Sequence, residues 1–528
     1  MKRILCLILS VILVATYLPG CGRSIDNSAY VPTGDAILME GQEPEDIEPE
    51  VEEEQKLVLA YYPDRSLNPL FGSDYTNRVL MSLMYQPLFA VDSNKNVTPI
   101  LCGQYQLSSN GRNLFIYLDA NATFSDGTKV TPADVVASYE YARTTDYYKN
   151  RFTHLINVQV TEDGTGILFQ MDTYFENFML LMDIPIVKGS EVEASVPTGT
   201  GPYIFDSTAK VLQRNRDWWC GDLEIPAKDL VIDLVAVTSP ADVRDAFQFG
   251  GENSVSVVCT NPMSSSFAEY SCDYELWQIE SGYMLFIGCN ILWSEHFDDG
   301  TLRTFLTYAI DRDALVKEVY KGMVTPVSLP CSPEAVYYSK SLSQSANYDA
   351  LKFIEKLARY NIPKEDGRTK TLQLAVNSND SARVTIARSI AAHLTELGLP
   401  TATKEYTSGV FRDVIYVGNF DIYLGMTRLS PNMDLSEFFR NYGNMSKGGI
   451  ANEILYGMCL KALENSGNYY NLYQKLVEDG RIIPVAFGQY NVYAHRGLLP
   501  DLNPSRDNVF YYSMGKDMKQ CQIETVYE

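Results

Sequence analysis

Few residues of this 528-residue chain stand in the patterns that bond-making chemistry requires. The four histidines, His154, His296, His393 and His495, are scattered, and the ten cysteines include no CxxC pair. No GxSxG, GxGxxG, HExxH or P-loop motif is present. Because nucleophilic, dinucleotide, zinc and phosphate chemistry each depend on such fixed spacings, the sequence supplies no catalytic set. We therefore expect no catalytic residue, no metal site, no cofactor and no enzyme activity.

One segment imitates a metal site without completing it. Residues 92–96 read Asp-Ser-Asn-Lys-Asn, like the start of a calcium-binding loop. Such a loop needs glycine at its sixth position and a bidentate glutamate at its twelfth. Val97 and Gly103 stand there instead, so we interpret the segment as a polar hairpin turn.

The position with the clearest prediction of covalent chemistry is Cys21. A positively charged start and an apolar run over residues 4–18 end in Leu18-Pro19-Gly20-Cys21. This order is typical of a secretory signal, and the cysteine after a small residue is similar to the lipobox of bacterial lipoproteins. The pattern predicts a signal peptide over residues 1–20 and a lipidated Cys21, anchored by acyl chains in the membrane. An uncleaved N-terminal anchor helix is the alternative.

Acidic residues dominate the segment after the predicted signal. Residues 43–54 hold eight acidic side chains in twelve positions, together with two prolines. Such a segment buries too little apolar surface to offset its ordering entropy, so residues 21–55 are predicted to be a disordered tether. An acidic binding tail is the alternative. The formal net charge of −23 excludes nucleic acid as an expected partner, because that partner requires a basic footprint.

Eight cysteines remain after Cys6 and Cys21 are set aside. Export would permit disulfides, and Cys259 and Cys272 are the closest pair in sequence. Buried free thiols are an equally good reading of the same residues.

Apolar periodicity predicts the elements that would position a site. Alternation predicts strands over residues 56–61 and 113–118, with a helix near 79–84 between them. Thr131-Pro132-Ala133-Asp134 predicts a helix start with a capping box.

Two further regions have clear patterns. The spacing of apolar residues over 302–310 predicts an amphipathic helix that begins near Asp299 and ends at Gly322. Residues 371–424 read as strand, helix, strand, helix, strand, which favours a doubly wound α/β lobe.

Several motifs, in order, resemble the bacterial extracellular solute-binding proteins of family 5, the peptide, oligopeptide and nickel importing class. The segment after residue 122 is similar to the family signature FSDGTPVTAEDVVYS. The motifs that carry the resemblance are Leu67-Asn68-Pro69-Leu70, Tyr85-Gln86-Pro87-Leu88-Phe89, Phe124-Ser125-Asp126-Gly127-Thr128, Thr198-Gly199-Thr200-Gly201-Pro202-Tyr203, Arg214-Asn215-Arg216-Asp217-Trp218-Trp219 and Ala309-Ile310-Asp311-Arg312.

The resemblance implies an α/β, two-lobed periplasmic-binding-protein-like fold of class II, the large peptide-binding type, with an extra subdomain on lobe one. It implies lobes that close on a buried ligand through a hinge. The expected parts are lobe one over residues 56–88, 196–285 and 486–528, the lobe-one subdomain over 89–195, and lobe two over 286–485.

One departure from the family pattern concerns the ligand. Peptide binders of the family often carry a tryptophan and, three residues later, an aspartate that pairs with the peptide amino terminus. Met426 and Leu429 stand at these positions, which puts that mode of capture in doubt. Arg428 could face an anionic group, since a guanidinium suits carboxylates, or it could be solvated or structurally paired. The candidate ligand contacts are Tyr75, Tyr85, Asn290 and Arg428.

The sequence therefore predicts a substrate-binding lipoprotein on the outer face of the cytoplasmic membrane. Its expected partners are a peptide or similar small ligand, the permease of an ABC transporter and the membrane, and it is expected to work as a monomer. A peptide-sensing lipoprotein on the same scaffold is the first alternative. An exported hydrolase is the second, although no motif supplies its nucleophile.

Overall fold

The computed structural model describes residues 56–71, 74–221, 223–251, 254–264 and 270–523. The predicted signal peptide (1–20), the lipidated Cys21 and the tether (21–55) lie outside the described residues. Within the described residues, no helix is both long and apolar enough to cross a bilayer.

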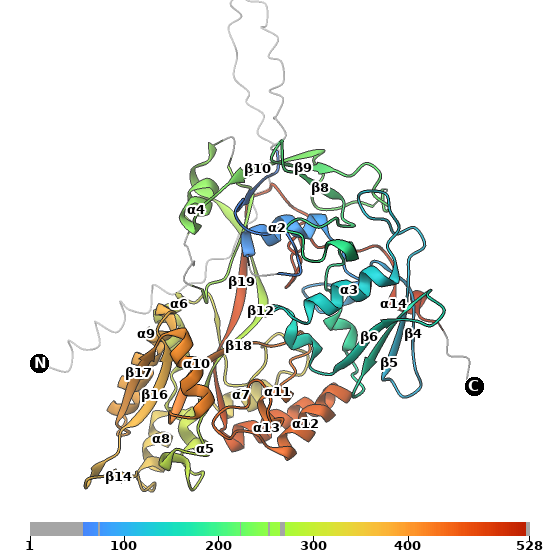
Figure 1. The fold of residues 1–528 in the computed structure, drawn as a ribbon. Coiled ribbons are helices and arrows are strands. Elements are labelled where there is room, and N and C mark those ends of the chain that lie inside the picture. Colours follow the sequence, from blue (N-terminus) through green and yellow to red (C-terminus); the bar gives the residue numbers. More distant parts are fainter. Residues whose placement is uncertain (1–55, 72–73, 222, 252–253, 265–269, 524–528) are drawn as a thin grey trace, which may run out of the picture. The chain divides into compact units, whose positions relative to one another are not determined.

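A single mixed sheet links the two lobes. Its strands run in the order β17-β16-β18-β12-β19-β11-β1-β10-β9-β8, and β13 pairs with β19. The two longest strands are β12 (Tyr274–Cys289) and β19 (Ile482–His495), which pair antiparallel. One end of this pair continues the strands of lobe one, and the other end continues those of lobe two (Figure 1).

The pairing between these two strands is interrupted at the crossing. The register shifts between Glu280 and Met284, and Gly282 adopts a φ of +81°. A Cβ on Gly282 would lie 2.1 Å from a terminal nitrogen of Arg506. A β-bulge bends its strand and increases the local twist, so the sheet changes direction where the lobes meet.

Lobe one has a parallel core. Strand β1 pairs in parallel with both β10 and β11, and its residues are all buried. The elements of this lobe are β1 (Val58–Tyr61), α2 (Tyr75–Met84), β8 (Tyr203–Asp206), β9 (Val211–Arg214), β10 (Val231–Ala236), α4 (Pro240–Phe249), β11 (Val257–Thr260) and the C-terminal α14 (Met518–Cys521).

Close backbone contact explains the glycines of the Thr198–Tyr203 motif. A Cβ on Gly201 would lie 2.4 Å from the carbonyl carbon of Met84, and one on Gly199 would lie 2.2 Å from the Met84 oxygen. The Gly201 N–H donates to that oxygen at 2.9 Å. These glycines therefore serve the scaffold, because any side chain would separate the two segments.

A four-stranded antiparallel sheet, in the order β4-β5-β7-β6, forms the subdomain. Helix α3 packs on it through Tyr139, whose ring meets Phe152 and Phe169 edge-on. The predicted capping box is confirmed, since Asp134 accepts from the Thr131 N–H at 2.8 Å. The elements are β2 (Phe89–Val91), β3 (Val97–Pro99), β4 (Cys102–Leu107), β5 (Asn113–Leu118), α3 (Pro132–Ala142), η1 (Lys149–Phe152), β6 (Leu155–Val160), β7 (Ile167–Met171), η2 (Phe178–Leu181) and η3 (Gly189–Glu191).

The predicted hairpin turn at residues 92–96 is also confirmed. It joins β2 to β3, and Asp92 accepts from the Asn96 N–H at 2.8 Å. No group of three metal-ligating side chains occurs among the described residues.

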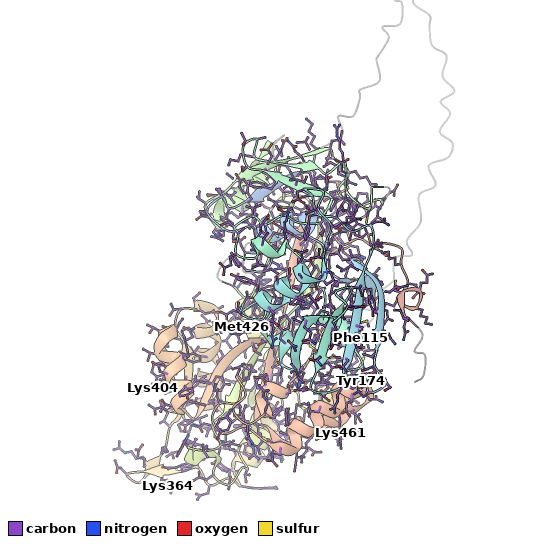
Figure 2. The ribbon with its side chains drawn as sticks, turned by 45° about the vertical axis from the view of Figure 1, so that its right-hand side comes forward. Phe115, Tyr174, Lys364, Lys404, Met426 and Lys461 are labelled. Atoms are coloured by element: carbon purple, nitrogen blue, oxygen red, sulfur yellow. The ribbon has the colours of Figure 1, made fainter. Side chains whose placement is uncertain are left out.

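Lobe two confirms the alternation predicted over residues 371–424. It contains β16 (Leu372–Asn377), α9 (Ser381–Glu396), β17 (Thr401–Tyr406), α10 (Ser408–Val417) and β18 (Ile422–Arg428), with β16 parallel to both β17 and β18. Figure 2 labels Met426 on β18 and Lys404 on β17, which lies two strands away in the order of the sheet.

The remaining elements of lobe two include β13, which belongs to the main sheet, and the separate β14-β15 hairpin. These remaining elements are η5 (Glu295–Phe297), α5 (Arg303–Leu306), η6 (Thr307–Ala309), α6 (Arg312–Tyr320), β13 (Thr325–Pro326), α7 (Lys340–Ser345), α8 (Ala350–Leu357), β14 (Lys364–Glu365), β15 (Arg368–Thr369), α11 (Ser436–Phe439), α12 (Glu453–Glu464), η7 (Ser466–Asn468) and α13 (Tyr469–Asp479).

The prediction of one helix from Asp299 to Gly322 is wrong. The chain forms the short α5 and η6, becomes extended at Ile310, and restarts as α6. Asp311 caps the new helix by accepting from the Ala314 N–H at 3.0 Å. The buried Arg312 donates to the carbonyl of Pro484 at 2.8 Å, so a tertiary contact fixes the break that periodicity alone does not reveal.

Every cysteine between 102 and 521 is a free thiol in the structure, including Cys259 and Cys272. The sequence left disulfides and free thiols as alternatives, and the structure contains free thiols.

Candidate functional site

A crevice lies at the carboxyl ends of the parallel strands of lobe one. Open α/β sheets bind ligands at this place, beyond the strand ends. The cavity has a volume of about 220 Å³. Its lining residues come from the ends of β1 and β11 and from the start of α2, and include Tyr62, Asp74, Tyr75, Thr260, Asn261 and Tyr270.

The crevice is lined by both polar and aromatic side chains, and not all of its polar groups are hydrogen-bonded. Asn261 donates through its amide to the Tyr75 hydroxyl at 3.3 Å, while the buried hydroxyl of Thr260 has no hydrogen-bond partner among the described residues. Unsatisfied buried polar atoms are uncommon in native proteins, and this one belongs to a residue that lines the crevice.

One face of helix α2 connects this crevice to the interior of the protein. Tyr75, Arg78, Ser82 and Tyr85 follow helical spacing and so lie along one stripe. Tyr75 lines the crevice, Arg78 lines a smaller cavity beside it, and Ser82 and Tyr85 line a third.

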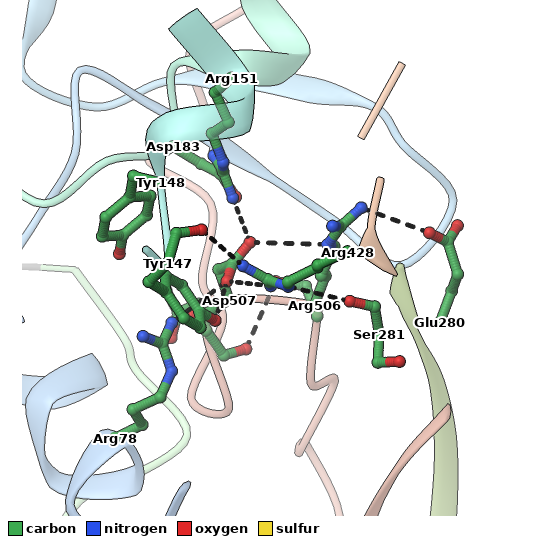
Figure 3. A network of polar contacts seen from close by, with 12 residues as sticks. Arg78, Tyr147, Tyr148, Arg151, Asp183, Glu280, Ser281, Arg428, Arg506 and Asp507 are labelled. Carbon is green, nitrogen blue, oxygen red and sulfur yellow. Dashed lines mark hydrogen bonds and ion pairs between the residues drawn. The ribbon is translucent and has the colours of Figure 1, made fainter. Parts of the chain in front are cut away.

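An ionic cluster lies where the lobes and the subdomain meet (Figure 3). Its centre is the carboxylate of Asp507, whose side chain is 3% exposed. One oxygen pairs with Arg78 at 3.1 Å and Arg428 at 2.9 Å. The other pairs with Arg151, and with the Nε of Arg506 at 4.0 Å.

These groups come from distant parts of the chain. Arg78 lies on α2, Arg151 on η1 of the subdomain and Arg428 at the end of β18 in lobe two. Asp507 therefore joins three parts of the fold through one carboxylate. Sequence reasoning did not find Asp507, Arg151 or Arg506, because no motif marks them.

The ring of Tyr147 packs against two guanidiniums of the cluster. The guanidinium of Arg428 lies 4.0 Å from the centre of the Tyr147 ring, and that of Arg78 lies 4.1 Å from it. The Tyr147 hydroxyl donates to Asp507. Burial raises the pKa of Tyr147 well above its usual range, so the phenol stays neutral and acts as a donor.

Charge in the cluster is unevenly balanced. Burial alone would raise the pKa of Asp507, but Arg428, Arg151 and Arg78 outweigh it and hold that pKa well below its ordinary value. Burial and the neighbouring Arg428 lower the pKa of Arg506. The first shift indicates a firmly ionised acid, and the second indicates crowding of positive charge.

Of the four predicted contacts, the structure brings three together. Tyr75 lines the crevice, with its ring centre 5.0 Å from that of Tyr490. Tyr85 is buried, and its hydroxyl donates to the Pro197 carbonyl at 2.9 Å while its ring lines a cavity beside Asp507. Arg428 proves to be structurally paired, and the anion that it faces is the protein's own Asp507.

Asn290 lies elsewhere. Its amide donates to the carbonyls of Gly418 at 2.8 Å and Phe420 at 2.7 Å, and its oxygen accepts from two backbone N–H groups, those of Leu292 and Trp293. In this structure its side chain holds the far end of β12 in lobe two, so it is separated from the other three.

Direct contacts also join the subdomain to lobe two. Asn150 donates to the Arg428 carbonyl at 2.8 Å. The imidazole of His154 lies 2.9 Å from Asp172 of the subdomain and 3.4 Å from Asp434 of lobe two.

Two α/β lobes joined by a pair of long strands, with a crevice at the strand ends, define the periplasmic-binding-protein-like class of receptor. The family model for bacterial extracellular solute-binding proteins, family 5, matches residues 96–449. The chain belongs to this family, and the resemblance predicted from its motifs is confirmed. It is accordingly a solute-binding protein of the extracellular type.

Among curated proteins, the chain is similar to the glutathione-binding protein GsiB of Escherichia coli K12. The two are 25% identical over 337 residues, which is 60% of this chain and 63% of that protein. The match therefore spans less than two thirds of the relative's length. GsiB of Salmonella typhi matches at the same identity and coverage.

Solved structures share the fold. HbpA2 from Haemophilus parasuis aligns with a TM-score of 0.69 and 19% identity, covering 86% of this chain and 98% of that one. The oligopeptide-binding protein AppA from Bacillus subtilis, solved with a nonapeptide, aligns with a TM-score of 0.62 and 20% identity, covering 88% and 100%. The predicted α/β two-lobed fold class is confirmed, while the domain limits stay a prediction.

Proposed function

We propose that this chain is the membrane-anchored substrate-binding protein of an ABC importer, and that it holds a peptide or similar small ligand between its lobes. In this role the protein makes and breaks no bond. It delivers the ligand to a permease on the outer face of the cytoplasmic membrane and works as a monomer.

The observation that carries the proposal is the crevice of about 220 Å³, lined by polar and aromatic side chains, at the strand ends of lobe one. It lies beside the strands that link the lobes, where hinge closure would enclose a guest. The names of two relatives support a peptide: GsiB is described as glutathione-binding, and AppA was solved with a nonapeptide.

Native ligand is expected to leave the protein on denaturation. Mass spectrometry of small molecules released from the purified protein should detect short peptides. Tyr75→Ala should lower the recovered amount about tenfold, because an aromatic anchor in a binding crevice typically contributes about 1–2 kcal/mol or more.

Tyr442→Ala is the matched control, since Tyr442 is fully exposed in lobe two and its loss should leave recovery unchanged. Recovery of a metal chelate or glycan in place of peptides would contradict the ligand class. A released set that is identical for the wild type and Tyr75→Ala would contradict the location.

The anchor has its own test. Cys21→Ser is expected to move the protein from the membrane fraction to the soluble fraction of lysed cells, because the hydroxyl cannot form the thioether that carries the acyl chains. The matched control, Cys6→Ser, alters the predicted signal without touching the modified residue. Continued membrane association of Cys21→Ser would favour the uncleaved anchor helix.

A further inference from the structure

The ionic cluster concentrates several cations around one buried carboxylate. Arg151, Arg428, Arg506 and Lys95 are paired with three carboxylates, those of Asp507, Asp183 and Glu280. Arg78 pairs with Asp507 as well. One buried carboxylate, that of Asp507, thus serves several guanidiniums, and burying an uncompensated charge is costly.

The shared carboxylate is on the tip of a tight turn. Ser505 and Asn508 bond to each other through their backbones, with the Ser505 N–H donating to the Asn508 carbonyl at 2.8 Å. Arg506 and Asp507 stand between them. The turn contains no helix or strand, and the ion pairs of its two charged side chains help to hold it against the rest of the protein.

Cavities flank this turn on two sides. One of about 30 Å³ and one of about 10 Å³ are both lined by Ser505, Asp507, Asn508 and Arg78. The buried amide oxygen of Asn508 has no hydrogen-bond partner among the described residues. A segment beside voids forgoes packing contacts, so displacing this turn costs less than displacing a close-packed one.

We propose that Asp507 is an internal stand-in for a ligand carboxylate, and that Arg78, Arg151 and Arg428 form a carboxylate-receiving site for acidic peptides. An incoming carboxylate takes the place of Asp507 on the guanidiniums, and the 505–508 turn moves aside. The inference rests on the proposed function and names the class of peptide.

The geometry links this site to the crevice. Tyr75 and Arg78 are one turn apart on α2, and both line the cavity that also contacts Asp507. A peptide lying in the crevice of lobe one therefore needs to extend a side chain by about one helical turn, roughly 5 Å, to reach the first guanidinium.

Two matched peptides test the proposal on the full-length protein in detergent. Glu-Ala-Glu and Gln-Ala-Gln have the same backbone, termini and nearly the same shape, and differ in two side-chain charges. Isothermal titration calorimetry should give at least tenfold tighter binding of Glu-Ala-Glu, because hydrogen bonds between charged partners are the strong ones. Arg428→Gln should reduce that ratio to below threefold.

Asp507→Asn tests the stand-in. Removing the internal competitor should tighten Glu-Ala-Glu binding by about fivefold or more, since a site that is occupied most of the time has a correspondingly weaker apparent affinity. Binding of Gln-Ala-Gln should stay within twofold. If Asp507→Asn does not fold, the wild-type ratio and its loss in Arg428→Gln decide the matter alone.

Equal affinities of the wild type for the two peptides would overturn the acidic preference but leave the importer function standing. If the wild type prefers Glu-Ala-Glu tenfold and Asp507→Asn shows the same preference, then Asp507 does not occupy the place of a ligand carboxylate. If neither peptide binds, the acidic-peptide site is wrong, and the released-ligand measurement then decides separately whether the proposed function also fails.

Discussion

Replacing Asp507 by alanine is expected to lower the free energy of unfolding by about 3–5 kcal/mol. Removing one partner of a buried ion pair leaves the other charge uncompensated, which is the costly case. Here the carboxylate is 3% exposed, and the guanidiniums of Arg78, Arg151 and Arg428 would lose their shared partner together. Urea unfolding followed by circular dichroism measures the change.

Asp501→Ala is the matched control from the same C-terminal segment. Asp501 and its partner Lys228 each have a side chain 67% exposed, and exposed pairs contribute little. The control should change stability by less than about 0.5 kcal/mol. A loss below about 1 kcal/mol for Asp507→Ala would mean that water reaches the guanidiniums.

The same substitution predicts a pH profile. The pKa of Asp507 is depressed in the folded protein, so its contribution is present above the ordinary aspartate pKa of about 3.9 and is lost only as pH falls below it. The difference in stability between wild type and Asp507→Ala should therefore be flat from pH 5 to pH 8. A difference that shrinks within that window would contradict the assignment.

Local patterns in the sequence were sufficient for the outlines of the fold. Residues 371–424 fold as predicted because each strand and helix there has its own periodicity and is bounded by turn residues. The helix predicted across Ile310 failed because Arg312 reaches the Pro484 carbonyl, a contact between residues far apart in the chain. Periodicity carries no information about such a contact.

The candidate site shows the same division. Arg428 is noticeable through its place in a family motif, but the motif does not say which group its guanidinium faces. That group, Asp507, is 79 residues away, and Arg151 joins from the subdomain. Neither Asp507 nor Arg151 lies in a recognisable sequence motif. The cluster exists only once the lobes and the subdomain are assembled, so it could not be predicted.

His154 is expected to make the stability of the protein pH-dependent above neutrality. Burial lowers its pKa, but hydrogen bonds to Asp172 and Asp434 outweigh burial and raise that pKa from 6.5 to about 9. A group whose pKa is raised on folding contributes its full stabilisation at pH values below its pKa in the unfolded chain. That contribution is lost progressively as the pH rises through its pKa in the folded protein. Between pH 6.5 and pH 9.5 the free energy of unfolding should fall by about 2–3 kcal/mol. This range allows for solvent screening of the half-exposed Asp172.

His154→Gln should flatten this profile, because glutamine keeps a polar side chain without the titrating charge. His393→Gln serves as the control, since His393 lies on α9 with a side chain 31% exposed. It should keep the wild-type dependence. Urea unfolding at half-unit steps of pH measures all three proteins, and a His154→Gln profile that parallels the wild type would contradict the prediction.

The titration of His154 also bears on how the lobes meet. His154 and Asp172 belong to the subdomain, whereas Asp434 and Ser436 belong to lobe two, and the imidazole lies within 3.0 Å of the Ser436 hydroxyl. Loss of the proton weakens a contact between parts of the fold that the hinge would separate. Small-angle scattering should therefore record a larger radius of gyration at pH 9.5 than at pH 6.5 in the wild type, and no such increase in His154→Gln.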